Sequence, residues 1–285
     1  MIKRCSGRYA GYGTMIPYTS TIQAGLSYVP YTGPLNLTTA IPWACYGIRA
    51  LKSTYYGNII RLRRSSDNTE KDFGSTISCD LDTASILSWV GSGDAYVRTW
   101  YDQSGNGRHM IQATNSSQPQ FVKSGALYLS NNRPYIKFNG VENGAATPLT
   151  ITANSPVAVH AVQYRQGNGV QDWVLGHTSA YNYHGTSTNN LWDSSYAASS
   201  VKNGTTRCMG QLFSPAINCN NAPIQSPCVI HHTNTSGAEW NNLGQDRSYH
   251  QSTGGYFELI VWATQSYTTN EALEMHNNQL SYYVV

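Results

Sequence analysis

Short runs of alternating apolar and polar residues recur along the chain from about residue 44 onward. The runs at 59–64 and 95–101 are rich in β-branched and aromatic residues, a composition that suits a half-buried strand. Further strand-like runs, separated by Gly, Asn and Ser turns, lie at 126–129, 135–138, 149–152, 157–164, 173–175, 229–232 and 256–262. Many short strands with little helix predict an all-β fold of two packed antiparallel sheets.

Two helices are predicted from their capping residues. Asp82 or Thr83 can cap a short helix that Gly91 ends, since Gly readily adopts the backbone conformation that closes a helix. A later helix follows Thr268, because Glu271 stands three residues on, at the spacing of a capping box. The sequence shows no other long helical pattern.

The chain divides into two parts by periodicity. Residues 1–44 are rich in Gly, Tyr, Thr and Pro and lack a regular pattern, so they predict an extended N-terminal arm that serves assembly or anchoring. Residues 45–285 predict one β-sandwich domain. The arm either lies on a neighbouring subunit or packs on its own domain, and the sequence favours neither.

Composition narrows the classes of partner. Only 12% of the 285 residues are charged, while Tyr and Trp number 21 and 7. A polar but weakly charged surface is typical of extracellular, carbohydrate-facing or virion proteins. The net charge of +3 is too mild to indicate nucleic acid, whose binding needs Lys and Arg clustered on one face, so we expect no nucleic acid partner. We expect no membrane span, because no apolar run approaches ~20 residues, and the basic N-terminus lacks the apolar stretch of an export signal.

Cysteines and metal ligands give few further signals. None of the six cysteines forms a C-x-x-C pair, so a zinc site is not expected. Cys208, Cys219 and Cys228 suit either a disulfide or free buried thiols. The loop 102–107 offers oxygen ligands but a single carboxylate, Asp102, which predicts a turn rather than a calcium site. We expect neither a metal nor a cofactor.

A resemblance to a known family is carried by three stretches: CYGIRALKSTYYGNIIRLRR, LDTASILSWVGSGDAYVRTWYDQSGNGRHMIQA and RPYIKFNG. Together these span roughly residues 44–140. They resemble the N-terminal half of the arabinofuranosidase B catalytic domain and related modules of phage and viral structural proteins. The resemblance implies a concanavalin A-like (laminin G-like) antiparallel β-sandwich jelly roll.

The resemblance also implies two catalytic positions. Asp246, shortly before the strand Gly255-Tyr-Phe-Glu258, is similar to the family's acid/base aspartate. The family's nucleophile is a glutamate, but the matching stretch 190–195 offers Asp193 as its only carboxylate. The family's adjacent cysteine pair is also absent from 169–176, so the site departs from the family's pattern in two places.

Aromatic residues in polar loops predict a carbohydrate-binding surface. Such rings can stack on sugars, and an interface with another subunit is the alternative. The predicted residues are Trp173, Tyr183, Trp192, Trp240 and Tyr249. His177, His184 and His250 lie in similar loops and are expected to be exposed.

The sequence favours a virion structural protein with a lectin-like domain. It would belong to a phage or viral head or tail and be of decoration or fibre type. Its expected partners are other virion proteins, further copies of itself and host-surface glycans. The expected location is the virion surface. The alternatives are a glycoside hydrolase of the α-L-arabinofuranosidase type and a non-catalytic carbohydrate-binding module.

Overall fold

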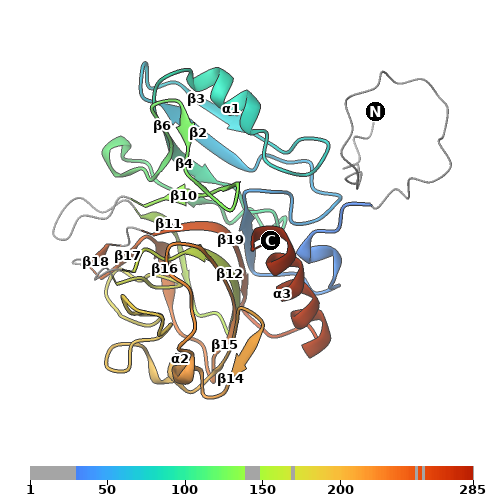
Figure 1. Ribbon diagram of the computed structural model, residues 1–285, viewed down its shortest axis with the longest axis vertical. Helices are drawn as coiled ribbons and strands as arrows, with labels where there is room; N and C mark the ends of the chain where they lie inside the picture. Colours follow the sequence, from blue (N-terminus) through green and yellow to red (C-terminus); the bar gives the residue numbers. More distant parts are fainter. Residues whose placement is uncertain (1–29, 139–147, 168–170, 248–249, 252–253, 285) are drawn as a thin grey trace.

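A computed structural model describes residues 30–138, 148–167, 171–247, 250–251 and 254–284 as an antiparallel β-sandwich with few helices (Figure 1). The first half of the chain supplies β1 (Ala44–Gly47), β2 (Ile60–Arg64), β3 (Glu70–Phe73), β4 (Ala95–Trp100), β5 (Met110–Ile111), β6 (Gln120–Lys123), β7 (Ala126–Leu127), β8 (Leu129–Ser130), β9 (Arg133–Pro134) and β10 (Ile136–Lys137). The second half supplies β11 (Leu149–Asn154), β12 (Ala158–Tyr164), β13 (Thr205–Cys208), β14 (Gln211–Phe213), β15 (Pro227–Thr233), β16 (Trp240–Leu243), β17 (Gln245–Asp246), β18 (His250–Gln251) and β19 (Gly255–Trp262). The helices are α1 (Thr83–Val90), α2 (Ser199–Lys202) and α3 (Thr269–Tyr283), with 3₁₀ turns η1 (Pro34–Asn36), η2 (Asn115–Ser117) and η3 (Ala216–Asn218).

The strands form two layers joined at β10. One layer runs β14-β13-β15-β12-β19, with β1 also paired to β19, and the other contains β3, β2, β4, β5, β11 and β16. Strand β10 pairs with β19 on one side and with β6 on the other, which links the layers. The main apolar core lies between them: Trp100 of β4 packs against Tyr46 of β1 with ring centroids 5.5 Å apart. The predicted all-β sandwich is confirmed.

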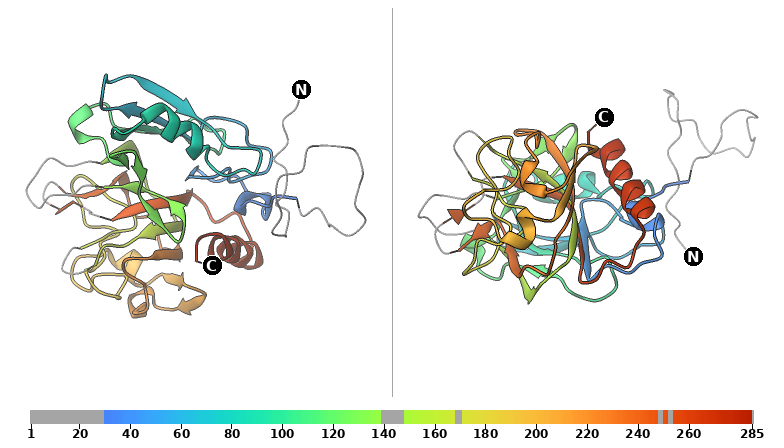
Figure 2. Two further views of the ribbon diagram at one scale, coloured as in Figure 1. Left: turned by 45° about the horizontal axis from the view of Figure 1, so that its top comes forward. Right: turned by 90° about the horizontal axis from the view of Figure 1, so that it is seen from below.

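The central strand β19 is buried at all eight positions. Its alternate residues Phe257, Leu259 and Val261 belong to the main core, whereas Ile260 and Trp262 belong to a second apolar cluster that includes Met275 of α3. Side chains of a strand alternate between faces, so a strand covered by the other sheet on one face and by a helix on the other is apolar throughout. Figures 1 and 2 show α3 lying along the outside of this layer.

The predicted helices form where their caps stand. Asp82 accepts a hydrogen bond from the Ser85 amide at the start of α1, and Gly91 ends that helix with φ of 65°. Thr268 and Glu271 form the capping box of α3. Helix α3 runs to Tyr283. Among the described residues no helix is long and apolar enough to cross a membrane.

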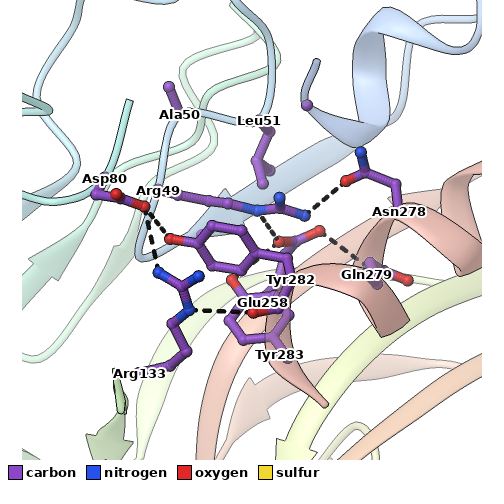
Figure 3. Close-up of polar contacts among 12 residues, drawn as sticks. Arg49, Ala50, Leu51, Asp80, Arg133, Glu258, Asn278, Gln279, Tyr282 and Tyr283 are labelled. Carbon is purple, nitrogen blue, oxygen red and sulfur yellow. Dashed lines mark hydrogen bonds and ion pairs between the residues drawn. The ribbon is translucent and has the colours of Figure 1, made fainter. Parts of the chain in front are cut away.

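A buried polar network fastens α3 to the sheet (Figure 3). Glu258 of β19 is fully buried and accepts hydrogen bonds from Arg49, Gln279 and Tyr283 at 2.9, 2.9 and 3.0 Å. Arg49, itself 1% exposed, also donates to Asn278 of α3 at 2.9 Å. Each charge is therefore paired inside the protein, which a buried ion pair requires.

Residues 30–44, the described part of the predicted arm, pack on their own domain. Leu35 is buried in the cluster beneath α3, and its amide donates to the Leu51 carbonyl at 3.0 Å. The Tyr31 hydroxyl bonds to the Ala50 carbonyl at 2.5 Å. The rest of the arm lies outside the described residues.

The loop 102–107 is a turn organised by Asp102. Its carboxylate accepts the amides of Cys45, Ser104 and Arg108 at 2.9 to 3.0 Å. Gly105 and Gly107 adopt φ of 89° and 70°, which glycine accommodates without strain. The described residues contain no cluster of three or more His, Cys, Asp or Glu side chains suited to hold a metal ion.

Candidate active site

Asp246 is the most chemically distinctive of the predicted catalytic residues. It ends the short strand β17, and its side chain is fully buried. Oδ2 lies 2.7 Å from Nδ1 of His184, while Oδ1 has no hydrogen-bond partner among the described residues. Burial raises the pKa of this carboxyl to about 6, and the hydrogen bond from His184 opposes the rise. The group therefore changes charge near neutral pH, as a general acid must.

Close backbone contact positions β17. The Gly176 amide donates to the Asn242 carbonyl at 2.9 Å, and the Arg247 amide donates to the His177 carbonyl at 2.7 Å. A Cβ atom on Gly176 would stand 2.0 Å from the Gln245 carbonyl oxygen, so only glycine lets the two segments approach this closely. The segment 173–177 therefore lies directly beside the strand that carries Asp246.

His184 is buried, not exposed as expected from its loop. It is 1% exposed, and its ring stacks on Trp173 at 6.0 Å with an interplanar angle of 16°. Tyr181 and Tyr196 approach it edge-on, with centroids at 4.9 and 5.6 Å. His177 is also largely buried, at 8%. The expectation failed because the partners that draw His184 inward are distant in sequence, whereas loop composition reports only local preference.

Asp193 lies next to His184 but does not contact Asp246. Its amide donates to the His184 carbonyl at 3.0 Å, and its Oδ1 accepts the amides of Ser195 and Tyr196, both at 2.8 Å. Asp193 contributes to a polar cavity of about 450 Å³. The other residues that line this cavity are Thr186, Asn190, Trp192, Ser194, Ile217, Asn218 and Asn220. Hydroxyl and amide groups of this kind can bind the hydroxyls of a sugar.

Four of the aromatic residues predicted to bind carbohydrate point into the protein. Trp173, Tyr183 and Trp192 are 1% exposed and Trp240 is 0% exposed. A ring that stacks on a sugar needs an open face, so the expectation that polar loops present these rings to solvent is wrong. Tyr183, Trp192 and Trp240 pack in the main core, and Trp173 is buried against His184. Trp192 also lines the polar cavity. Their carbohydrate-binding role stays a prediction, and Tyr249 lies outside the described residues.

Tyr196 is an exposed aromatic residue beside His184. It is 55% exposed. Tyr181 lies 5.2 Å from it, and the Arg247 guanidinium stands 4.5 Å over the Tyr181 ring. The sequence offered no local signal for this difference, because Tyr181, Tyr183 and Tyr196 occupy similar polar surroundings.

The three cysteines of the second half are free and buried. Cys208 and Cys228 lie on neighbouring strands with their Sγ atoms 3.8 Å apart, and Cys219 is also a free thiol. Of the two possibilities that the sequence left open, the structure shows thiols. Cys79, by contrast, is disulfide-bonded.

The known proteins that this chain resembles are arabinofuranosidases. Residues 38–144 match the family model described as α-L-arabinofuranosidase B, catalytic. A crystal structure of an arabinofuranosidase complexed with arabinofuranosyl-α-1,2-xylobiose is 15% identical, with a TM-score of 0.54, over 87% of this chain and 64% of that chain. A mutant α-L-arabinofuranosidase of family GH54, soaked with 4-nitrophenyl α-L-arabinofuranoside, is 14% identical, with a TM-score of 0.51 and the same coverage. No curated protein matches the chain.

These matches support the fold and the resemblance seen in the sequence. The chain spans 64% of the length of the solved structures, and at this identity they show a shared fold. The matched residues 38–144 precede both Asp193 and Asp246, so the family match covers the scaffold and not the site.

The interpretation as a virion structural protein is wrong. The family model and the solved structures all describe arabinofuranosidases, and none describes a component of a virus particle. A low charge and aromatic polar loops had suggested a particle surface, but the same composition fits a domain that faces carbohydrate. Composition could not separate the two classes.

Proposed function

We propose that the chain is a glycoside hydrolase of the α-L-arabinofuranosidase type with Asp246 as its general acid. The observation that carries the proposal is the buried Asp246 carboxyl, whose pKa burial raises to about 6 and whose Oδ1 lacks a hydrogen bond within the described residues. Carboxyls with strongly shifted pKa values concentrate at catalytic sites, because catalysis needs a pKa matched to the reaction. An unpaired buried oxygen costs stability, so its presence also indicates a functional position. The family match over residues 38–144 supports the same activity.

The proposed reaction uses Asp246 first as acid and then as base. Its proton passes to the glycosidic oxygen while the bond from that oxygen to the anomeric carbon breaks and the electron pair stays on the oxygen. In a retaining enzyme a second carboxylate bonds to the anomeric carbon, and water then displaces it and returns a proton to the first. Asp193 is the candidate for the second carboxylate, because its amide is bonded to the His184 carbonyl and its side chain borders the polar cavity.

A hydrolysis assay tests the proposal. The purified chain should release 4-nitrophenol from 4-nitrophenyl α-L-arabinofuranoside, and Asp246→Asn should lower kcat by about 100-fold or more, because the second step then lacks its base. Glu274→Gln on the exposed face of α3 serves as the control and should keep the wild-type rate. Absence of turnover by the wild type, or full activity of Asp246→Asn, would contradict the proposal.

Product analysis tests Asp193 separately. A carboxylate nucleophile gives retention at the anomeric carbon and a covalent glycosyl-enzyme intermediate. Proton NMR of the first-formed product should therefore show the α-anomer, and Asp193→Asn should abolish turnover. An inverted product, or normal turnover by this variant, would remove Asp193 from the role.

A second candidate is binding of arabinofuranosides without hydrolysis. One observation favours it: the Asp193 carboxylate caps its own turn, where Oδ1 accepts the Ser195 and Tyr196 amides, an arrangement that does not require a role as nucleophile. Calorimetric titration of the wild type with the same glycoside distinguishes the two functions. Saturable binding without release of 4-nitrophenol would identify a binding module.

A further inference from the structure

The imidazole of His184 is bonded at both nitrogens. Nδ1 lies 2.7 Å from Oδ2 of Asp246, and Nε2 lies 3.2 Å from Oε1 of Gln171. A carboxylate can only accept a hydrogen bond, so Nδ1 carries the proton that Asp246 receives, and Nε2 of the neutral ring is then an acceptor. The Gln171 amide meets Nε2 with its NH₂ group, whose place a half-turn of the amide exchanges with that of Oε1. The three side chains form a directed chain of hydrogen bonds.

Packing fixes the plane of the ring. Trp173 lies nearly parallel to the imidazole, and Tyr181 and Tyr196 meet it edge-on. The Trp173 and His184 backbones are also joined by an isolated β-bridge. With 1% of its surface exposed, the His184 side chain has no room to rotate away from Asp246.

The pairing makes the two oxygens of Asp246 unequal. Oδ2 is occupied by His184, whereas Oδ1 has no partner among the described residues. We propose, on the basis of the function proposed above, that His184 is the positioning residue that occupies Oδ2, so that Oδ1 carries the transferable proton, and that stabilises the carboxylate left after proton transfer. The proton leaves Oδ1 for the glycosidic oxygen, and the Nδ1–H···Oδ2 hydrogen bond then compensates the negative charge on Asp246. A hydrogen bond to the charged form favours that form, and the same contact lowers the pKa of Asp246 against the effect of burial.

Two substitutions separate this role from simple packing. His184→Phe keeps an aromatic ring between Trp173 and the two tyrosines but removes the donor. His184→Asn keeps an N–H close to the position of Nδ1 but removes the ring. Both variants are checked for the wild-type near-ultraviolet circular dichroism spectrum, and the titration of the Asp246 carboxyl carbon is followed by ¹³C NMR. The pH profile of kcat/KM is recorded in parallel.

The donor role predicts opposite outcomes for the two variants. In His184→Phe the midpoint for Asp246 should rise by about one pH unit, as expected for loss of a charge-assisted hydrogen bond, and kcat/KM should fall by about tenfold or more. In His184→Asn the midpoint should return close to the wild-type value. An unchanged midpoint in a folded His184→Phe protein, or equal shifts in both variants, would overturn the proposal.

The NMR titration needs no turnover, so it separates this inference from the proposed function. If the wild type does not hydrolyse the glycoside but the midpoint responds to the donor, the proposed hydrolase activity fails and the pairing of His184 with Asp246 stands. If hydrolysis depends on Asp246 but the midpoint ignores His184, the positioning role fails and the hydrolase activity stands.

Discussion

Mild acid should destabilise this fold through histidines buried in their neutral form. His160, His232 and His276 are each 0% exposed. Burial is the largest cause that lowers their pKa values, to about 4 for His232 and His276 and well below the ordinary range for His160. His231 stacks on His160 at 4.0 Å, and the Arg207 charge further lowers the pKa of both His231 and His276. The cluster therefore resists protonation in the folded state.

The sign and size of the effect follow from proton linkage. Below about pH 6.5 the unfolded chain binds protons at these histidines and the folded chain does not, so the free energy of unfolding falls as pH falls. From pH 7.5 to 5.5 each of the four histidines costs about 1.4 kcal/mol, or about 5–6 kcal/mol together. Asp246 acts in the opposite direction, because its raised pKa makes the folded state bind a proton near pH 6, which offsets about 1 kcal/mol. The net loss is about 4–5 kcal/mol, a large part of the 5–15 kcal/mol typical of a domain.

Urea unfolding followed by tryptophan fluorescence at pH 7.5, 6.5 and 5.5 measures this loss. The wild type should lose about 4–5 kcal/mol over that range, and His276→Gln should lose about 1.4 kcal/mol less. A free energy of unfolding that stays constant from pH 7.5 to 5.5 would show that these histidines are not buried in their neutral form. An equal loss in wild type and His276→Gln would remove His276 from the effect.

Further predictions concern the polar network of α3 and the segment 173–177 beside Asp246. Glu258→Gln leaves Arg49 buried without a counter-charge and should lower the free energy of unfolding by about 3–5 kcal/mol. The exposed control Glu274→Gln should change it by no more than about 0.5 kcal/mol, and equal effects of the two in urea unfolding would contradict a buried ion pair. Gly176→Ala should destabilise the protein by about 1–3 kcal/mol and reduce glycoside hydrolysis, because the added Cβ pushes Gln245 away. Unchanged activity and an unchanged thermal midpoint would show that this close approach is not needed.

The fold was largely predictable because its signals are local. Thr268 and Glu271 mark the start of α3 within four residues, and Asp82 with Gly91 brackets α1 in the same way. The uninterrupted apolar run of β19 indicated a strand, but only the structure shows that α3 covers one of its faces. The end of α3 has no such local signal, because Tyr283 is held by a hydrogen bond to Glu258, a residue distant in the sequence.

The site was predictable only in part. Asp246 was found through its place before β19 in a family resemblance, while its partner His184 is 62 residues away and gave no signal in the sequence. Trp173 and Tyr196 lie in equally polar loops, yet one ring is buried and the other exposed. Which way a loop side chain turns depends on the strands it packs against, and no short-range pattern records that choice.

Leaving-group dependence tests the role of Asp246 most directly. 4-Nitrophenol departs readily without a proton, whereas methanol needs one, so loss of a general acid slows the methyl glycoside more. The measurement is kcat/KM of wild type and Asp246→Asn on 4-nitrophenyl and methyl α-L-arabinofuranoside. General-acid catalysis by Asp246 predicts that the substitution slows the methyl glycoside at least about tenfold more than the 4-nitrophenyl glycoside. Equal losses on the two substrates, or no loss on either, would contradict it.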